Sequence, residues 1–526
     1  MVNRESEPVR QPVPGNPYVQ PVPPAGTPRR LRFALGAGAV ALVLIGVGLY
    51  AVTQADGDGD GSGSRRPVAG QTRQSPDGGR ESAEPGQDAD SDADGADGKD
   101  EGAGAVIDVN AGRKPGEAKA WVAMNDVKLP GKGAQLLDLW HVDGIVAQAE
   151  YDEVTGYRTA DGSKAWSVPL PGTVCDTPVN PTPDGKVVVV YTKRKSERNT
   201  KCDQLRMIDL KTGEKGWHKE LVDGGFWDDT SMTHVSITGS TVMVDQSATM
   251  RGYRIGDGKR LFTTERERKG GCSLDGVAGG SRLLQVEGCQ PGSPSTHGRL
   301  KRLDPRTGDV KWSYRTKKGW SIRKVYSVAP AVIAVQNRDE MDEWGVVAVD
   351  DKGKQRSWIR LDKGPDVFSM CAGAGDSGEG MQNCPGAAVG ADTLYLASEP
   401  KDGILGPNKI VAYDLRTGKS KWTGSVGGGR QITPVTVAGG KQPGVIAYAF
   451  AQDGKSGQTL RFGPKGGKPD VLLRHTSSAQ EMESGMLAGN TLYADGRFFV
   501  TPTRLEGKAH GGKGEEDSAR MLSFAR

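Results

Sequence analysis

Hydrophobic and polar positions alternate in short runs that recur along most of the chain, and most runs end in the same kind of turn. In the clearest copy, Met207 to Leu210 alternates as a half-buried strand does, Thr212 and Gly213 reverse the chain, and Trp217 opens a second strand. Gly accepts the positive φ that such a turn needs, and the Thr hydroxyl bonds nearby backbone amides. The pattern therefore predicts pairs of antiparallel strands joined by tight turns.

This strand-turn-strand unit recurs in six copies, and in five of them an aromatic residue falls four residues after the turn Gly. Together with a first, unpaired copy, the aromatic residues are Trp121, Trp166, Trp217, Phe262, Trp312, Trp358 and Trp422. A degraded eighth position lies at 471–473. Successive aromatic residues are separated by 45 to 64 positions, and strand-rich repeats of that length indicate a β-propeller. Each ring is expected to open the outer strand of a blade and to cover the joint with the next blade.

The two ends of the repeat array are incomplete in complementary ways. Trp121 opens the array with no strand before it, and residues 521–526 end the chain as a strand with no turn or Trp after it. If both ends share one blade, the ring closes and leaves no exposed sheet edge. We therefore expect an all-β, eight-bladed propeller of four-stranded antiparallel blades over residues 117–526. Seven blades are the alternative, because residues 423–520 are irregular and loop-rich.

Composition separates the first 116 residues from the array. Residues 1–32 are rich in Pro, and residues 54–116 form an acidic, Gly- and Asp-rich linker, so both are predicted to be disordered. Residues 33–53 hold no charge and no Pro, which fits one transmembrane helix. Because Arg residues precede this span and Asp residues follow it, we expect a single-pass cell-membrane protein with a cytoplasmic N-terminus and an extracytoplasmic propeller. A cleaved signal peptide is the alternative.

One stretch of the linker has the spacing of a calcium-binding loop. Asp90 to Glu101 match the EF-hand pattern, in which carboxylates recur at alternate positions and a Gly follows the third. The flanks contain Pro85 and Gly102 instead of helices, and Asp97 occupies a position that is usually apolar. In so Asp- and Gly-rich a tract the match is expected to be accidental, and no metal site is predicted.

The six cysteines fall in pairs within single predicted blades. The first member of each pair follows an outer-strand aromatic residue by 9 to 13 positions, and the second precedes the next outer strand. An even number of cysteines in an extracytoplasmic domain favours disulfides. Placement within blades favours the pairs Cys175–Cys202, Cys272–Cys289 and Cys371–Cys384. The chain has no CxxC and its six His show no ligand spacing, so neither a thiol-redox site nor a zinc site is predicted.

The repeat resembles the pyrroloquinoline quinone (PQQ) repeat. The resemblance rests on the pattern D-x-x-T-G-x-x-x-W and on Pro-containing strands such as residues 175–179 and 432–435, and it covers residues 117–526. It implies a bacterial member of the PQQ-like β-propeller superfamily, which includes quinoprotein alcohol dehydrogenases and the propeller lipoprotein of the outer-membrane barrel-assembly machinery. These motifs are specific for the fold and unspecific for the function.

The resemblance leaves two classes of function. Quinoprotein dehydrogenases of this superfamily carry an adjacent Cys-Cys disulfide, a calcium ion held by Glu and Asn, and a catalytic Asp; this sequence has no adjacent Cys pair, and no residue matches those ligands. Carboxylate pairs such as Asp228 with Asp229, or Glu481 with Glu483, are expected to be solvated. We therefore predict a non-catalytic binding or scaffold module with no cofactor. A PQQ- and calcium-dependent dehydrogenase is the alternative.

The loops that lead from each outer strand to the next inner strand carry the candidates for a binding face. These are Phe226, Trp227, Asp228, Trp320, Phe368 and Arg430. They either line one face for a protein or glycan partner or pack beneath the loops. The whole chain carries a net charge of +4, residues 1–32 carry +3 and residues 54–104 carry −8, which leaves +9 on residues 105–526. We expect an unidentified protein or anionic envelope polymer as the partner, and no nucleic acid.

Overall fold

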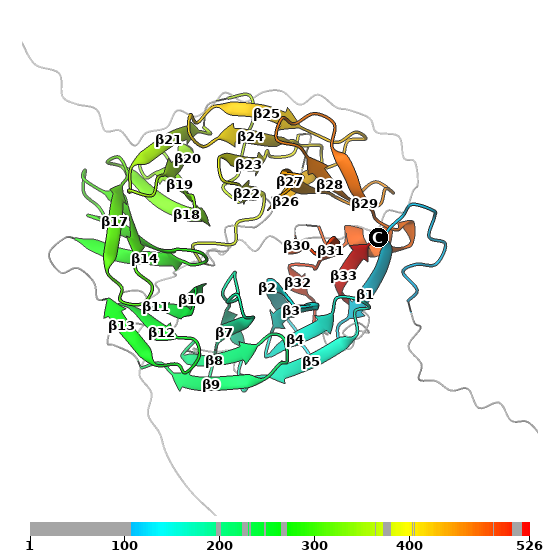
Figure 1. Ribbon diagram of the computed structural model, residues 1–526, viewed down its shortest axis with the longest axis horizontal. Coiled ribbons are helices and arrows are strands. Elements are labelled where there is room, and N and C mark those ends of the chain that lie inside the picture. The colour runs from blue at the N-terminus through cyan, green and yellow to red at the C-terminus, as the bar shows by residue number, and fades with distance from the viewer. Residues whose placement is uncertain are drawn as a thin grey trace, which may run out of the picture. The chain divides into compact units, whose positions relative to one another are not determined.

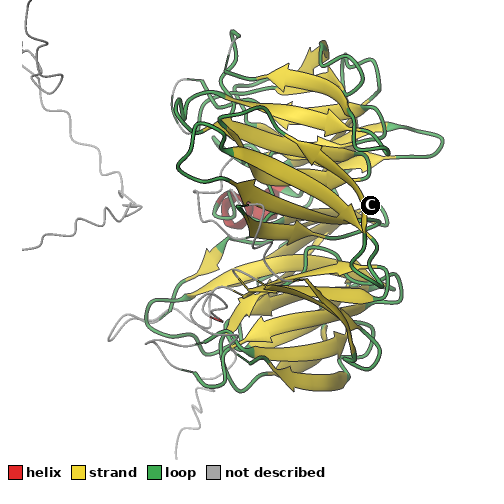
Figure 2. Cartoon of the chain, turned by 90° about the vertical axis from the view of Figure 1, so that its left-hand side faces the viewer, coloured by secondary structure: helices red, strands yellow, loops and turns green. Residues whose placement is uncertain are grey.

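The fold is a ring of eight antiparallel sheets (Figure 1). The structure is a computed structural model that describes residues 107–195, 201–222, 230, 233–246, 249–264, 271–362, 364–371, 380–401, 403, 405–487, 489–507 and 518–526. Strands make up nearly all of its regular structure (Figure 2), and the described helices are the short η2 (Ser477–Ala479) and α1 (Gln480–Ser484). The prediction of an all-β, eight-bladed propeller is confirmed, and the seven-bladed alternative is wrong.

Each of the first four blades runs from an inner strand near the axis to an outer strand at the rim (Figure 1). Blade 1 contains β2 (Ala134–Val142), β3 (Ile145–Glu150), β4 (Glu153–Arg158) and β5 (Lys164–Pro169). Blade 2 contains β6 (Val174–Asp176), β7 (Lys186–Tyr191), β8 (Gln204–Asp209) and β9 (Lys215–Glu220). Blade 3 contains β10 (Thr233–Thr238), β11 (Thr241–Gln246), β12 (Thr249–Arg254) and β13 (Arg260–Thr264). Blade 4 contains β14 (Cys272–Ala278), β15 (Leu283–Cys289), β16 (His297–Leu303) and β17 (Val310–Arg315).

The remaining blades repeat this order, except that the last one uses both ends of the array. Blade 5 contains β18 (Trp320–Val328), β19 (Ala331–Asn337), β20 (Trp344–Val349) and β21 (Gln355–Arg360). Blade 6 contains β22 (Ala387–Val389), β23 (Thr393–Ala397), β24 (Ile410–Asp414) and β25 (Ser420–Gly424). Blade 7 contains β26 (Ile432–Ala438), β27 (Gly444–Ala449), β28 (Gln458–Phe462) and β29 (Asp470–Arg474). Blade 8 contains β30 (Thr491–Ala494), β31 (Arg497–Val500), β33 (Ala519–Ala525) and β1 (Lys119–Met124).

Burial explains the two hydrophobic patterns in the sequence. Middle strands such as β7 and β20 are packed between two neighbouring blades, so their apolar runs are buried on both faces. Outer strands such as β5 and β9 keep one face near solvent, so charged and apolar positions alternate. The unbroken apolar runs therefore mark the middle of each blade, and the alternating segments mark its rim.

The ring of Trp166 shows how neighbouring blades are joined. It packs between Gly156 in β4 of its own blade and Gly213 in the turn of blade 2. A Cβ atom on Gly213 would lie only 2.7 Å from the ring, and the φ of this residue is 75°, so both contact and backbone require Gly. The same contact with the next turn is made by Trp121 with Gly162, Trp217 with Gly258, Phe262 with Gly308, Trp312 with Gly353 and Trp422 with Gly466. Trp358 differs, because its ring packs edge-on against Trp320 at 4.8 Å.

Blade 8 closes the ring with strands from both ends of the array. β1 pairs antiparallel with β33 from Lys119 opposite Ala525 to Met124 opposite Ala519, and β33 pairs on its other edge with β31. The predicted sharing of one blade is confirmed, with β33 as the third strand from the axis. A buried ion pair of 3.0 Å between Arg520 in β33 and Glu150 in β3 connects blade 8 to blade 1.

Two features depart from a plain array of four-stranded blades. The sheet of blade 1 has a fifth strand, because β32 (Arg504–Leu505) pairs with the start of β2. The folded region also begins before residue 117. Val109 is buried, and the amide of Asn110 exchanges hydrogen bonds of 2.8 and 2.9 Å with the backbone of Ala120.

All six cysteines form the three predicted disulfides, Cys175–Cys202, Cys272–Cys289 and Cys371–Cys384. The first disulfide connects β6 to the loop before β8, both in blade 2. The second connects the paired strands β14 and β15 of blade 4.

Within the described residues, no helix is both long and apolar enough to cross a membrane. The predicted span 33–53, the Pro-rich segment 1–32 and the calcium-like stretch from Asp90 to Glu101 lie outside the described residues.

Candidate functional site at the propeller axis

A cavity of about 1170 Å³ lies at the axis of the ring. Its wall consists of inner strands, mainly β2, β6, β10, β14 and β18, and of the long connection between β21 and β22. A propeller has this geometry because each blade contributes one inner strand to the axis, so residues far apart in sequence meet there. The cavity is therefore the natural candidate for a binding site.

Residues 380–385, which we call the axial segment, cross this cavity. The side-chain amide of Gln382 exchanges hydrogen bonds of 2.6 and 3.0 Å with the backbone of Gly279, beside blade 4. The Asn383 amide donates to Asp138 in blade 1 at 2.7 Å, and the Val325 amide in blade 5 donates to the Met381 carbonyl at 2.8 Å. Because blades 1 and 5 lie on opposite sides of an eight-bladed ring, the axial segment spans the axis. The Cys371–Cys384 disulfide ties its end to the preceding loop.

Three carboxylates and an imidazole gather where blades 2, 3 and 4 meet the cavity. Asp176 at the end of β6 accepts a hydrogen bond of 2.6 Å from the Val235 amide, and its Oδ1 lies 3.7 Å from Nδ1 of His234. His234 in β10 is directly opposite Asp245 in β11, so both side chains lie on one face of blade 3. Asp275 projects from β14. We call Asp176, His234, Asp245 and Asp275 the axial carboxylate cluster.

Burial raises the pKa of all three aspartates in this cluster. Loss of solvation raises the pKa of Asp245 to about 7, and the nearby charge of His234 offsets only part of that rise. Burial also raises the pKa of Asp275 to about 6, against a hydrogen bond from the Gly288 amide and the charge of Arg323. The pKa of Asp176 is raised by the same cause. These groups therefore change protonation closer to neutral pH than ordinary aspartates do.

The lining of the cavity is acidic although the domain is basic. Seven carboxylates line it, from Asp138, Asp176, Asp245, Asp275, Asp342, Asp362 and Asp366. Only three lysine or arginine side chains do so, from Arg323, Lys324 and Arg504. Two of the carboxylates are neutralised from outside the cavity, Asp366 by Lys409 at 2.7 Å and Asp362 by Arg360 at 2.5 Å. The remaining excess of negative charge favours cations over anions at the axis.

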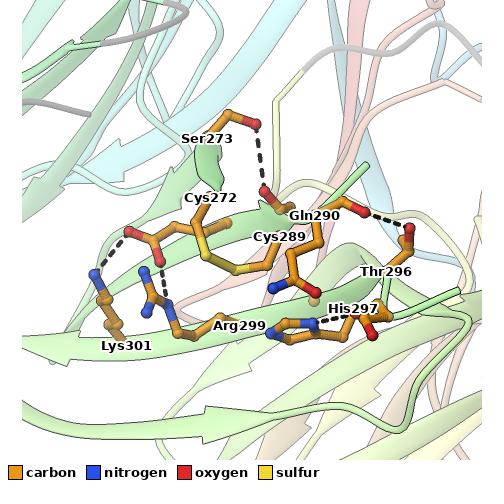
Figure 3. Close-up of a disulfide and its surroundings, with 12 residues drawn as sticks. Cys272, Ser273, Cys289, Gln290, Thr296, His297, Arg299 and Lys301 are labelled. Atoms are coloured by element: carbon orange, nitrogen blue, oxygen red, sulfur yellow. Dashed lines mark hydrogen bonds and ion pairs between the residues drawn. A yellow bond between two sulfur atoms is a disulfide. The ribbon is translucent and has the colours of Figure 1, made fainter. Parts of the chain in front are cut away.

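A second cavity of about 590 Å³ adjoins the first at His234, Asp245 and Asp275. The Cys272–Cys289 disulfide joins two strands of blade 4 (Figure 3), and Cys289 lines this cavity. Within the part of the chain that the structure describes, Cys272, Glu287 and Cys289 are the only set of three or more carboxylate, thiol or imidazole groups close enough to share a metal ion. Both sulfurs are joined in the disulfide, and Glu287 pairs with Arg299 at 2.5 Å and with Lys301 at 2.8 Å. This group is therefore structural and does not hold a metal.

The residues predicted to line a face are buried where the structure describes them. Trp320 is 7% exposed and packs against Trp358, so it belongs to the blade interior. Arg430 is also 7% exposed and donates hydrogen bonds to the Ser456 carbonyl at 2.8 Å and to Gln458 at 3.0 Å. Phe368 is buried, with one side at the axial cavity. Of the two alternatives, packing beneath the loops therefore describes the burial of these three residues. Phe226, Trp227 and Asp228 lie outside the described residues.

One carboxylate that was expected to be solvated is fully buried. Glu483 in α1 accepts a hydrogen bond of 2.8 Å from the Tyr448 hydroxyl and lies 2.6 Å from Nδ1 of His475, whose Nε2 lies 3.0 Å from the Thr459 hydroxyl. A hydroxyl, an imidazole and a carboxylate in line are the geometry of an acyl-transfer triad. Here Thr459, His475 and Glu483 are each at most 1% exposed, so no substrate can reach them. The network instead fastens α1 to blade 7.

The axial carboxylate cluster is the part of the site that the repeat pattern does not reveal. Asp245 ends the apolar run of β11, and Asp176 follows Cys175 in a short inner strand. A charged residue within an apolar strand was the available signal, because burying a carboxylate is costly and needs a reason. What the sequence does not show is that three blades bring these residues together.

The chain is similar to one protein family and to several solved structures. The family profile described as "Outer membrane protein assembly factor BamB" matches residues 108–270 and 264–496. Among solved structures, BamB from Moraxella catarrhalis is 16% identical with a TM-score of 0.43, and the match covers 78% of this chain and 98% of that one. The quinohemoprotein alcohol dehydrogenase ADHIIG from Pseudomonas putida HK5 is 13% identical with a TM-score of 0.43, and the match covers 78% and 76% of the two chains. No curated protein matches the sequence significantly.

Proposed function

Because this chain belongs to the PQQ-repeat family described as outer membrane protein assembly factor BamB, we propose that its propeller is a non-catalytic binding or scaffold module. The family description names an assembly factor. The rigid ring, closed by blade 8, suits such a role, since loops on a fixed frame present a surface without reorganisation. The partner is an unidentified protein or an envelope polymer.

The charge of the axial cavity is the observation that carries this proposal over a dehydrogenase. PQQ is a tricarboxylate, and among the described residues the axis offers five carboxylates besides Asp362 and Asp366, against three basic side chains. Like charges at this density oppose the binding of a trianion. The axial segment also occupies the space across the axis, where Gln382 and Asn383 bridge different blades. The residues present therefore do not fit this cofactor.

The proposed location is the outer side of a cell membrane. Residues 33–53 would form the single transmembrane helix, and the acidic linker would separate the propeller from the bilayer. The three disulfides of the propeller support an oxidising compartment. Protease added to intact cells should release a fragment that contains the propeller. Complete protection of that fragment would contradict this orientation.

Cofactor uptake and partner capture test the function itself. The purified full chain, given PQQ and calcium, should show no saturable cofactor absorbance and no dye reduction with alcohols. Crosslinking in intact cells, followed by capture of the anchored protein, should recover a defined envelope component. Stoichiometric PQQ uptake with dye reduction would overturn the scaffold proposal in favour of the dehydrogenase.

A further inference from the structure

Asp245 is a buried carboxylate with an unsatisfied oxygen at the wall of both cavities. The residue is 5% exposed, and within the described residues its Oδ1 accepts no hydrogen bond. The hydroxyl of Ser236, on the same face of blade 3, is also buried and has no partner among the described residues. Native proteins rarely leave such atoms unpaired, because each one costs free energy unless a partner arrives. Two of them beside one cavity point to a ligand.

A ligand group that pairs with Asp245 should carry positive charge. The basic side chains of the lining are directed elsewhere: Lys324 donates to the Gly380 carbonyl at 2.9 Å, Arg504 donates to the Lys132 carbonyl, and the charge of Arg323 acts on Asp275. The negative charge of Asp176 thus repels that of Asp245, and His234 is the nearby group that offsets part of this repulsion. A cation would relieve both the repulsion and the loss of solvation.

An organic cation fits this wall better than a metal ion. Among the described residues, no three side chains of the axial carboxylate cluster come close enough together to share one ion. An ammonium or guanidinium group instead presents several N–H donors that spread over separated acceptors. The cavity of about 1170 Å³ also has room for the chain that carries such a group.

We propose that the axial cavity binds a primary ammonium or guanidinium group at the wall formed by Asp245, Asp176 and Ser236. This inference deepens the proposed function, and it rests on that function only for the source of the cation. A scaffold would receive it as a lysine or arginine side chain of its protein partner. A free diamine carries the same chemistry, and the experiment separates the two sources.

The test is calorimetric titration of the full chain in detergent with three probes. These are putrescine, the peptide acetyl-Gly-Lys-Gly-amide, and the neutral control acetyl-Gly-Gln-Gly-amide. We expect the lysine peptide to bind and the glutamine peptide not to bind. D245N should weaken binding of the lysine peptide at least tenfold. D470N should leave it unchanged, since Asp470 is an exposed carboxylate on the outer strand β29 that pairs with Arg461.

The pH dependence gives a second readout. Asp245 is faced by His234 from its own blade, Asp176 from blade 2, and Asp275 and Arg323 from blades 4 and 5. Because the cation binds the ionised carboxylate, binding should strengthen between pH 6 and pH 8 and should release a proton, measured in buffers of different ionisation enthalpy. D245N should abolish that proton release.

Each outcome of the titration either supports or overturns the proposed site. Absence of binding by both cationic probes, or equal binding by D245N and the parent chain, overturns the site. Calcium chloride that binds in an Asp245-dependent manner and excludes putrescine also overturns it, in favour of a metal. Putrescine binding without peptide binding supports the site and identifies a diffusible ligand as the source. PQQ uptake would overturn the proposed function while leaving the titration result standing.

Discussion

Asp245 shows how one buried carboxylate makes stability depend on pH. Its folded-state pKa, about 7, lies above the ordinary value of 3.8, so the folded chain keeps a proton that the unfolded chain releases. Stability conferred by this group is therefore present at acid pH and is lost as pH rises from about 4 to about 7. At neutral pH the cost is on the order of a few kcal/mol.

D245N should remove that dependence. We expect its free energy of unfolding to match the parent chain near pH 4 and to exceed it at pH 8, because the amide is neutral throughout. Urea unfolding at a series of pH values measures the difference between the two proteins. The exposed control D470N should show no such divergence. A D245N chain that is less stable at pH 8 would mean that the carboxylate has a partner.

Gly213 tests the contact that joins neighbouring blades. Substitution by Ala places a methyl group 2.7 Å from the Trp166 ring and forces a side chain into a backbone with φ of 75°. We expect G213A to lower the free energy of unfolding by about 1–3 kcal/mol. The matched control is G239A, with φ of 59° but no atom within 4 Å of the new methyl, which should cost less. Equal losses in the two variants would show that the backbone conformation alone matters.

The elements that could be predicted from the sequence are those that recur in every blade. The turn Gly and the aromatic residue recur because each joint between blades needs both. The sequence therefore predicts that the Trp166 ring covers the joint, and the structure adds its contact with Gly213. The disulfides were predictable for the same reason, since each pair lies within one repeat. Irregular elements were not predictable. β32 and α1 occur once, and buried Glu483 accepts hydrogen bonds from Tyr448 and Gly457 of blade 7.

The Cys272–Cys289 disulfide lets the contribution of one element be measured. It joins paired positions of β14 and β15 and closes a loop with a sequence separation of 17. In the chain-entropy account, its loss should cost about 3 kcal/mol. The double variant C272S/C289S should unfold at lower urea concentration by that amount, with the other two disulfides intact by non-reducing peptide mapping. Adding a reductant to the parent chain should destabilise it further, because all three bonds are then lost.

For the whole molecule, the axial site could not be predicted because it exists only in the closed ring. Asp176, Asp245 and Asp275 lie in three different blades, and none belongs to a motif. Their meeting depends on the blade count, because the angle between blades sets which inner strands face one another. The axial segment reaches from blade 5 to Asp138 in blade 1 for the same reason. The site forms only when the ring of blades is closed, and blade 8 closes it, so the site depends on blade 8.

Removal of β33 tests that dependence. Met521, Leu522 and Phe524 are fully buried, and the strand pairs with both β1 and β31, so its loss strips two ladders and leaves Trp121 on an unpaired strand. Burying apolar side chains of this size stabilises by about 1.5–3 kcal/mol each. A chain that ends at Ser518 should therefore lose a large share of a typical stability of about 5–15 kcal/mol. A chain that lacks only Arg526 should lose little, since that exposed residue lies beyond the ladder.

A peptide of residues 519–526 should bind the shortened chain and restore its thermal midpoint, because the open edges of β1 and β31 accept the missing strand. A peptide in which Leu522 and Phe524 are replaced by Ser should not restore it, since the side chains that fill the core are gone. If the peptide also recovers binding of the lysine probe, then ring closure is what assembles the axial site. A shortened chain that melts within a degree or two of the parent would show that blade 8 does not hold the ring together.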